Sequence, residues 1–137
     1  MTEPGSGGLV LVDVGNTAVT LGLYRDGDVA GQSSVPCFDH RLTDRRQALQ
    51  EVAAGCRVEG AVLASVVPAV DAFWAADLEH LFRVPVLQVT HRVKLGVAVD
   101  YPAPESIGAD RLANAAGAVA RHGAPVIVAD LGTALTF

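Results

Sequence analysis

The sequence has few charged residues, few aromatics, two cysteines and no long apolar run. Charged residues make up 18% of the 137 positions and hydrophobic residues 50%, which is too apolar for a disordered chain. Lys and Arg total 10 against 15 Asp and Glu and form no basic run, which argues against binding to a nucleic-acid backbone. Every apolar stretch is broken well before about 18 residues. We therefore expect a folded protein that binds neither nucleic acid nor membrane.

The cysteines and the N-terminus bear on the cellular compartment. Neither Cys37 nor Cys56 belongs to a C-x-x-C pair, and we interpret both as reduced thiols. Residues 1–8 are polar and glycine-rich and lack the basic and apolar regions of a secretory signal. We predict a cytoplasmic protein that begins with a flexible leader over residues 1–8.

The pattern of apolar residues predicts an α/β domain. An apolar run at 9–14, a loosely alternating stretch at 18–24 and a further stretch at 29–35, with a tight turn at 25–28, predict a three-stranded meander. Helical periodicity follows over 43–54 and 70–82, and short strands are expected at 61–67 and 85–89. The resulting order, β-β-β-α-β-α-β, predicts a mixed sheet with helices packed on it.

The rest of the chain predicts one more helix and one more strand. After a looser segment at 91–107, an alanine-rich helix is expected over 109–121, ended by Gly123 and Pro125. The apolar residues 126–129 are expected to form a strand. In the helix over 70–82, Phe73 and Trp74 are expected in the core rather than as a ligand platform.

The two ends of the chain resemble each other. Leu11-Val-Asp-Val-Gly-Asn-Thr-Ala-Val-Thr aligns with Val128-Ala-Asp-Leu-Gly-Thr-Ala-Leu-Thr once one residue is gapped. The copies lie too far apart for a solenoid repeat, so we interpret them as a domain duplication. In each copy an apolar strand ends in Asp, a Gly permits a turn with φ > 0, and Asn or Thr follows as a side-chain donor.

Such a turn suits the binding of phosphate. It brings backbone N–H groups and hydroxyls close to phosphate oxygens, while the Asp holds Mg²⁺ directly or through water. Two such turns facing each other would clamp the phosphate tail of a nucleotide. The alternative is that Asp-x-Gly only closes two hairpins. The motifs G-x-x-x-x-G-K-[ST] and G-x-G-x-x-G are both absent, so a nucleotide site here must be of another type.

A third group of residues lies around the start of the predicted helix at 109–121. Tyr101-Pro-Ala-Pro precedes it, and Gly108-Ala-Asp-Arg111 opens it. A carboxylate in the first turn is favoured by the helix dipole, so this group can be an ordinary helix start. Alternatively, Asp110 is a general base and Arg111 binds an anion.

Taken together, these motifs resemble type III pantothenate kinase, a family of the actin, sugar kinase and Hsp70 superfamily, over about Leu9 to Phe137. The resemblance implies a ribonuclease H-like first domain and the ATP-dependent phosphorylation of the primary hydroxyl of pantothenate, the first step towards coenzyme A. It also implies Mg²⁺, a monovalent cation (K⁺ or NH₄⁺) and a homodimer.

The resemblance also implies roles for individual residues. Asp110 would take the proton from the hydroxyl, and pantothenate would be bound by Tyr101, Gly108, Ala109 and Arg111. Asp13 and Asp130 would be the metal-binding carboxylates. The residues that bind ATP and its phosphates would be Asp13, Gly15, Asn16, Thr17, Gly132 and Thr133.

Two readings of function compete with the kinase. One is a catalytically inactive regulatory or assembly protein of the transcriptional accessory type, and the other is an actin-like or sugar-kinase relative with another acceptor. The presence of both Asp13 and Asp110 favours the enzyme. We expect residues 9–122 to form the first domain and 123–137 only to begin a second, actin-like domain, so the 137-residue chain alone is expected to be inactive.

Overall fold

The computed structural model describes residues 7–37, 42–132 and 135–136. The chain divides into two compact units, Met1–Gln88 and Val89–Phe137, and each is described by itself. The first strand begins at Gly7, inside the predicted leader, of which residues 1–6 lie outside the described part. The predicted domain over 9–122 takes in parts of both units, and it stays a prediction.

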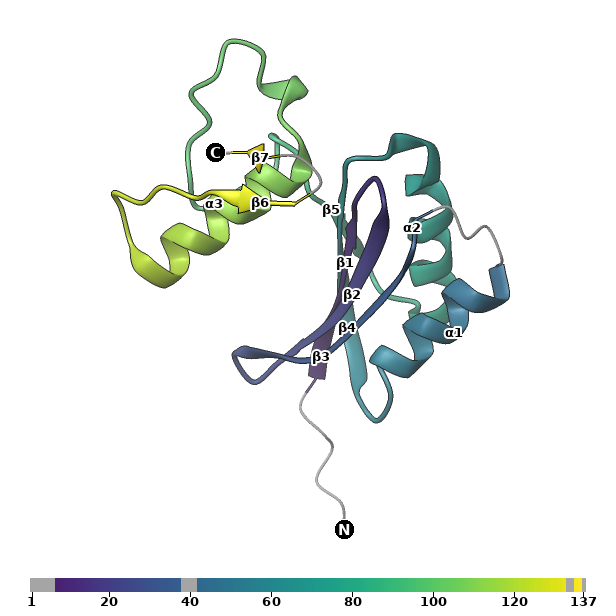
Figure 1. The fold of residues 1–137 in the computed structure, drawn as a ribbon. Helices are drawn as coiled ribbons and strands as arrows, with labels where there is room; N and C mark the ends of the chain where they lie inside the picture. Colours follow the sequence, from purple (N-terminus) through teal and green to yellow (C-terminus); the bar gives the residue numbers. More distant parts are fainter. Residues whose placement is uncertain (1–6, 38–41, 133–134, 137) are drawn as a thin grey trace. The chain divides into compact units, whose positions relative to one another are not determined.

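The first unit is built on a five-stranded mixed sheet in the order β3-β2-β1-β4-β5 (Figure 1). Strands β1 (Gly7–Val14), β2 (Ala18–Arg25) and β3 (Asp28–Pro36) form the predicted antiparallel meander. Strand β4 (Arg57–Ser65) runs parallel to β1, and β5 (Val86–Gln88) runs parallel to β4. The predicted α/β class is confirmed, and this strand order is typical of a ribonuclease H-like sheet.

Helices α1 (Leu42–Val52) and α2 (Pro68–Phe82) pack on one face of this sheet (Figure 1). Strand β1 alternates between its faces, and its buried side chains, Val10, Val12 and Val14, belong to the same core cluster as Leu49 of α1. The core also contains Trp74 and Leu78 of α2. Burial of these side chains removes apolar surface from water and is the main term that stabilises the unit.

The prediction for the two aromatics of α2 is half right. Trp74 is 1% exposed and lies in the core, whereas Phe73 is 54% exposed, so its predicted core position was wrong. Adjacent residues of an α-helix point about 100° apart, so where Trp74 points into the core Phe73 is turned towards the edge of the buried face.

The second unit has less regular structure. It contains a short 3₁₀ helix, η1 (Pro104–Ser106), then α3 (Ala109–His122) and a two-stranded ladder of β6 (Asp130–Leu131) and β7 (Leu135–Thr136). Helix α3 ends as predicted, because Gly123 follows it with φ of 75°.

The strand predicted over residues 126–129 was wrong. These residues pair with no strand in the described part of the chain, and the side chain of Ile127 is 91% exposed. An apolar sequence favours a strand only where a neighbouring strand supplies hydrogen bonds and side-chain contacts. The ladder begins instead at Asp130.

Both cysteines are free thiols, as predicted. Cys37 is buried, and desolvation raises the pKa of its thiol, whereas Cys56 is half-buried and its Sγ contacts the carbonyl oxygen of Arg57 at 3.6 Å. Among the described residues, no helix has the length and apolar character needed to cross a membrane.

Candidate functional site

Asp13 lies one residue before the end of β1 and is exposed to solvent. It stands opposite Thr20 on β2 and Ala64 on β4 in the strand register. Because β1 alternates, and Val12 and Val14 point into the core, Asp13 lies on the sheet face away from the helices. The strand therefore presents a carboxylate to solvent beside the turn that follows it.

Backbone hydrogen bonds fix the turn between β1 and β2. The Gly15 N–H donates to the Ala18 carbonyl oxygen at 2.9 Å, and the Cys37 N–H donates to the Thr17 carbonyl oxygen at 3.0 Å. The side chains of Asn16 and Thr17 are exposed in the bend. A phosphate-binding loop needs this arrangement, in which the backbone is fixed and the polar side chains reach solvent.

The expected role of Gly15 needs correction. The positive φ predicted for it was wrong, because its backbone lies outside the left-handed region. A Cβ at this position would lie 3.1 Å from the carbonyl oxygen of Ala18, a very tight contact. The glycine is therefore suited to the close approach of the two strand ends, and not to an unusual backbone conformation.

Ser65 lies at the same sheet edge and was not singled out from the sequence. It ends β4 directly opposite Val14, and the next amide, that of Val66, donates to the Val14 carbonyl oxygen at 3.0 Å. The Ser65 hydroxyl accepts a hydrogen bond from the Val67 N–H at 3.0 Å. A serine at the carboxyl end of a strand parallel to β1 could have signalled this position, because such ends meet at one edge.

The residues predicted to bind pantothenate lie in the second unit. Tyr101 is 54% exposed, and Gly108 is the extended residue immediately before α3. Ala109 is buried, whereas Arg111 is exposed. Asp110 is half-buried, and its Oδ1 accepts a hydrogen bond from the Arg111 N–H at 2.8 Å.

This group has the properties expected for an anion site next to a carboxylate. The N-cap residue of α3, Gly108, makes no side-chain capping hydrogen bond, and the positive end of the helix dipole favours a negative group in the first turn. Arg111 adds a cation in the same turn. An ordinary helix start has the same geometry.

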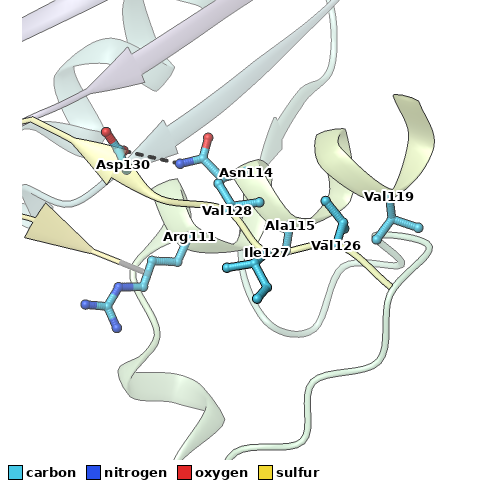
Figure 2. A pocket seen from close by; sticks show the side chains of 8 residues that line it. All are labelled: Arg111, Asn114, Ala115, Val119, Val126, Ile127, Val128 and Asp130. Carbon is cyan, nitrogen blue, oxygen red and sulfur yellow. Dashed lines mark hydrogen bonds between the residues drawn. The ribbon is translucent and has the colours of Figure 1, made fainter. Parts of the chain in front are cut away.

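Asp130 begins β6 and is half-buried, and its Oδ2 accepts a hydrogen bond from Asn114 Nδ2 at 3.2 Å (Figure 2). Gly132 is exposed in the bend after β6, and Thr133 lies outside the described residues. The structure thus brings together, within the second unit, one predicted metal ligand and a side chain of α3 that the sequence did not single out.

A cavity of about 370 Å³ lies between α3 and the chain leading into β6. Its polar lining comes from Arg111, Asn114 and Asp130, and its apolar lining includes Val119 and Ile127. Figure 2 shows the guanidinium of Arg111 directed away from the apolar side chains. The lining of the cavity therefore contains a cation from α3 and a carboxylate from β6, and its other side chains are mostly apolar.

The donor set fits Mg²⁺ bound together with a nucleotide. The described residues contain no group of three or more His, Cys, Asp or Glu side chains that could hold a metal alone. Mg²⁺ usually takes one or two carboxylates and completes its shell with phosphate oxygens and water. Asp13 is an exposed carboxylate in the first unit, and Asp130 is a half-buried carboxylate in the second, so each unit has one side chain of the required type.

Comparisons with known proteins identify a family. A sequence model described as type III pantothenate kinase matches residues 9–137. A relative from Shouchella clausii is 34% identical over 136 residues, and one from Finegoldia magna is 30% identical over 135; each alignment covers 94% of this chain. A relative from Akkermansia muciniphila is 48% identical over 91 residues, which is 66% of this chain. All three are named type III pantothenate kinase.

The chain spans about half the length of the first two relatives, 53% and 52%, and 36% of the third. A solved structure from Bacteroides thetaiotaomicron, described as a protein with actin-like ATPase fold and unknown function, superposes with a TM-score of 0.46 at 14% identity. That superposition covers 61% of this chain and 33% of the other.

Proposed function

The chain belongs to the type III pantothenate kinase family, and from this premise we propose that the protein transfers the γ-phosphoryl group of ATP to the primary hydroxyl of pantothenate. The family match over residues 9–137 is the observation that carries the proposal, because it takes in all four of the motifs described above. In the reaction a bond forms between the hydroxyl oxygen and the γ-phosphorus while the bond to the β–γ bridging oxygen breaks. The products are 4'-phosphopantothenate and ADP.

Asp110 is proposed to accept the proton of the attacking hydroxyl. Its Oδ1 already accepts the Arg111 N–H, so the second carboxylate oxygen would take the proton. Arg111, Gly108, Ala109 and Tyr101 are proposed to bind pantothenate, whose carboxylate is a suitable partner for the exposed guanidinium of Arg111. Catalysis of phosphoryl transfer rests mainly on such alignment and on charge neutralisation.

Asp13 and Asp130 are proposed to hold Mg²⁺, which would neutralise charge on the phosphates. Asn16 and Thr17 are proposed to contact the phosphates with their exposed side chains in the turn after β1, and Gly15, whose N–H donates to the Ala18 carbonyl oxygen, is proposed to hold that turn in shape beside the phosphates. Gly132 and Thr133 are proposed to contact the phosphates after β6. The monovalent cation, K⁺ or NH₄⁺, belongs to the same proposal, and its test is the dependence of turnover on each chloride salt.

A homodimer and a cytoplasmic location complete the proposal. Sedimentation equilibrium of the purified protein tests the first, and microscopy of a fluorescent fusion tests the second. Neither is needed for the assignment of the phosphoryl acceptor.

The test of the reaction uses a fusion of this chain to the remaining half of the Shouchella clausii relative, which supplies the length that the alignment does not cover. We expect formation of 4'-phosphopantothenate from ATP and pantothenate, detected by mass spectrometry. Asp110→Asn should lower kcat by about 10²–10⁴ and leave the affinity for Mg-ATP unchanged. Asn can still accept the Arg111 N–H, so the helix start is kept.

Glu105→Gln is the matched control, because it neutralises an exposed carboxylate of η1. An unchanged kcat in Asp110→Asn would show that Asp110 only starts the helix. Saturation-transfer NMR of the 137-residue chain with pantothenate and with Mg-ATP supplies a second measurement. Binding of both without turnover in the fusion would favour the inactive regulatory relative, and binding of neither would contradict the proposal.

A further inference from the structure

We propose that Asn114 is a positioning residue that orients the carboxylate of Asp130, an inference that rests on the proposed role of Asp130. The observation is the hydrogen bond from Asn114 Nδ2 to Asp130 Oδ2 at 3.2 Å (Figure 2). The amide of Asn114 donates to one named oxygen of the carboxylate. This contact restricts rotation of the carboxylate about its side-chain bonds.

The position of Asn114 on α3 gives the contact its significance. Asn114 follows Asp110 by four residues and Arg111 by three, so it lies one helical turn beyond both. One rigid helix therefore carries the proposed base, the proposed anion-binding cation and the side chain that holds Asp130. The hydrogen bond between Asn114 and Asp130 ties the start of β6 to that helix.

The rest of the local structure holds Asp130 weakly. Strand β6 has only two residues, and the side chains of Leu131 in β6 and of Ile127, three residues before Asp130, are 82% and 91% exposed. Packing therefore does little to fix this segment. Carboxylates that ligate metals are commonly oriented by a hydrogen bond from a second residue, and loss of such a partner weakens metal binding.

Stability alone is a poor explanation of the contact. Asn114 is exposed, so water can satisfy its amide when the hydrogen bond is absent, and little folding free energy depends on it. What water does not replace is the fixed direction of the carboxylate. Orientation can therefore be separated from stability by experiment.

The experiment compares the labelled 137-residue chain with its Asn114→Ala variant and with Gln47→Ala. Gln47 is the matched control, because its amide donates to the Glu51 carboxylate at 2.8 Å on an exposed face of α1. Three-bond couplings at Asp130 report its side-chain rotamer without any ligand. Amide shifts of residues 130–132 during Mg²⁺ titration at fixed ATP report metal binding, and ATP with EDTA gives the metal-free reference.

We expect one Asp130 rotamer in the wild type and in Gln47→Ala, and rotamer averaging in Asn114→Ala. The apparent Mg²⁺ affinity should fall about 10-fold in Asn114→Ala only, with metal-free ATP binding and the thermal midpoint unchanged. An unchanged rotamer together with an unchanged Mg²⁺ affinity would overturn the proposal. If the amide shifts of residues 130–132 in the wild-type chain do not change with Mg²⁺, the proposed metal-binding role of Asp130 fails. The three-bond couplings at Asp130 then still decide whether Asn114 orients its side chain.

Discussion

At the scale of single residues, the position of Asp13 separates its effect on binding from its effect on folding. The carboxylate is exposed at the end of β1, whereas the neighbouring Val12 and Val14 are buried. Its removal therefore leaves the core intact.

We expect Asp13→Ala to weaken Mg-ATP binding while the thermal midpoint stays within about 2 °C of the wild type. The physical reason is the loss of a metal ligand, which the nucleotide phosphates and water cannot fully replace. Isothermal titration of the purified chain measures the affinity. Asp28→Ala is the control, because Asp28 is an exposed carboxylate at the start of β3 and belongs to no proposed site. Equal affinity for Mg-ATP in the wild type and Asp13→Ala would contradict the proposed metal site.

The two thiols are expected to differ in reactivity and in their effect on stability. Burial raises the pKa of the Cys37 thiol, so less of it is thiolate at a given alkaline pH, and reagents also reach it poorly. We expect iodoacetamide to modify Cys56 well before Cys37 in the folded chain, as measured by peptide mass spectrometry. Modification at equal rates would show that Cys37 is accessible.

The sign of the pH dependence follows from the same burial. The folded pKa of Cys37 lies above the unfolded value, so its contribution to stability is complete at low pH and is lost as pH rises through the folded pKa. Urea unfolding between about pH 8 and pH 10.5 should show a steeper loss of stability in the wild type than in Cys37→Ala. Identical slopes would contradict a raised pKa.

At the scale of helices and strands, a buried ion pair joins α1 to α2. Asp77 is 2% exposed and accepts hydrogen bonds from Arg45 Nε at 3.0 Å and Arg46 Nε at 2.9 Å. The Arg45 guanidinium also lies 5.7 Å from the ring centroid of Phe73 and 5.9 Å from that of Trp74. Phe73 thus remains half-exposed while it contacts a cation at the boundary of the core.

Asp77→Ala should lower the free energy of unfolding by about 3 kcal/mol, because it leaves the buried guanidinium of Arg45 without its carboxylate. Urea unfolding followed by tryptophan fluorescence measures this change, since Trp74 is the only tryptophan. Glu79→Ala on the exposed face of α2 should change stability by less than about 0.5 kcal/mol. Equal effects of the two substitutions would show that the ion pair is not a net stabilising contact.

The elements that the sequence predicts best are those whose signals are local. The turn at Asp26 and Gly27, both with positive φ, and the meander of β1, β2 and β3 were predicted because the backbone preference of turn residues and the apolar pattern of strands act within a few residues. Residues 126–129 were mispredicted because a strand depends on a partner that no local pattern reveals.

The candidate site shows the same division. The motif around Asp13 was found from its order of residue types, but the reason for Gly15 lies in its distance from the Ala18 carbonyl oxygen, which only three-dimensional structure gives. Asn114 was missed because its partner, Asp130, lies 16 residues away. Spacing from Asp110 alone could not distinguish it from the other polar residues of α3.

At the scale of the whole molecule, the proposed groups are divided between two units. Asp13 belongs to Met1–Gln88, whereas Asp110 and Asp130 belong to Val89–Phe137. Phosphoryl transfer depends on the alignment of donor, metal and acceptor, and a misplacement of about 1 Å can cost 10²-fold in rate. Activity therefore depends on how firmly each unit holds its own residues.

We expect the 137-residue chain alone to phosphorylate pantothenate at no more than the rate without enzyme. Its first unit has a well-packed core, but in the second unit Asp130 lies on a two-residue strand beside apolar side chains, those of Ile127 and Leu131, that remain exposed. Asn114 orients the carboxylate of Asp130, but so short a strand does not hold the segment that carries it with the preorganisation that catalysis needs. The assay supplies ATP, Mg²⁺, pantothenate and either K⁺ or NH₄⁺, with circular dichroism as the check that the chain is folded. The fusion to the Shouchella clausii half is the positive control. Rapid formation of 4'-phosphopantothenate by the folded chain alone would contradict the prediction, because it would show that the short strand β6 already holds Asp130 well enough for catalysis.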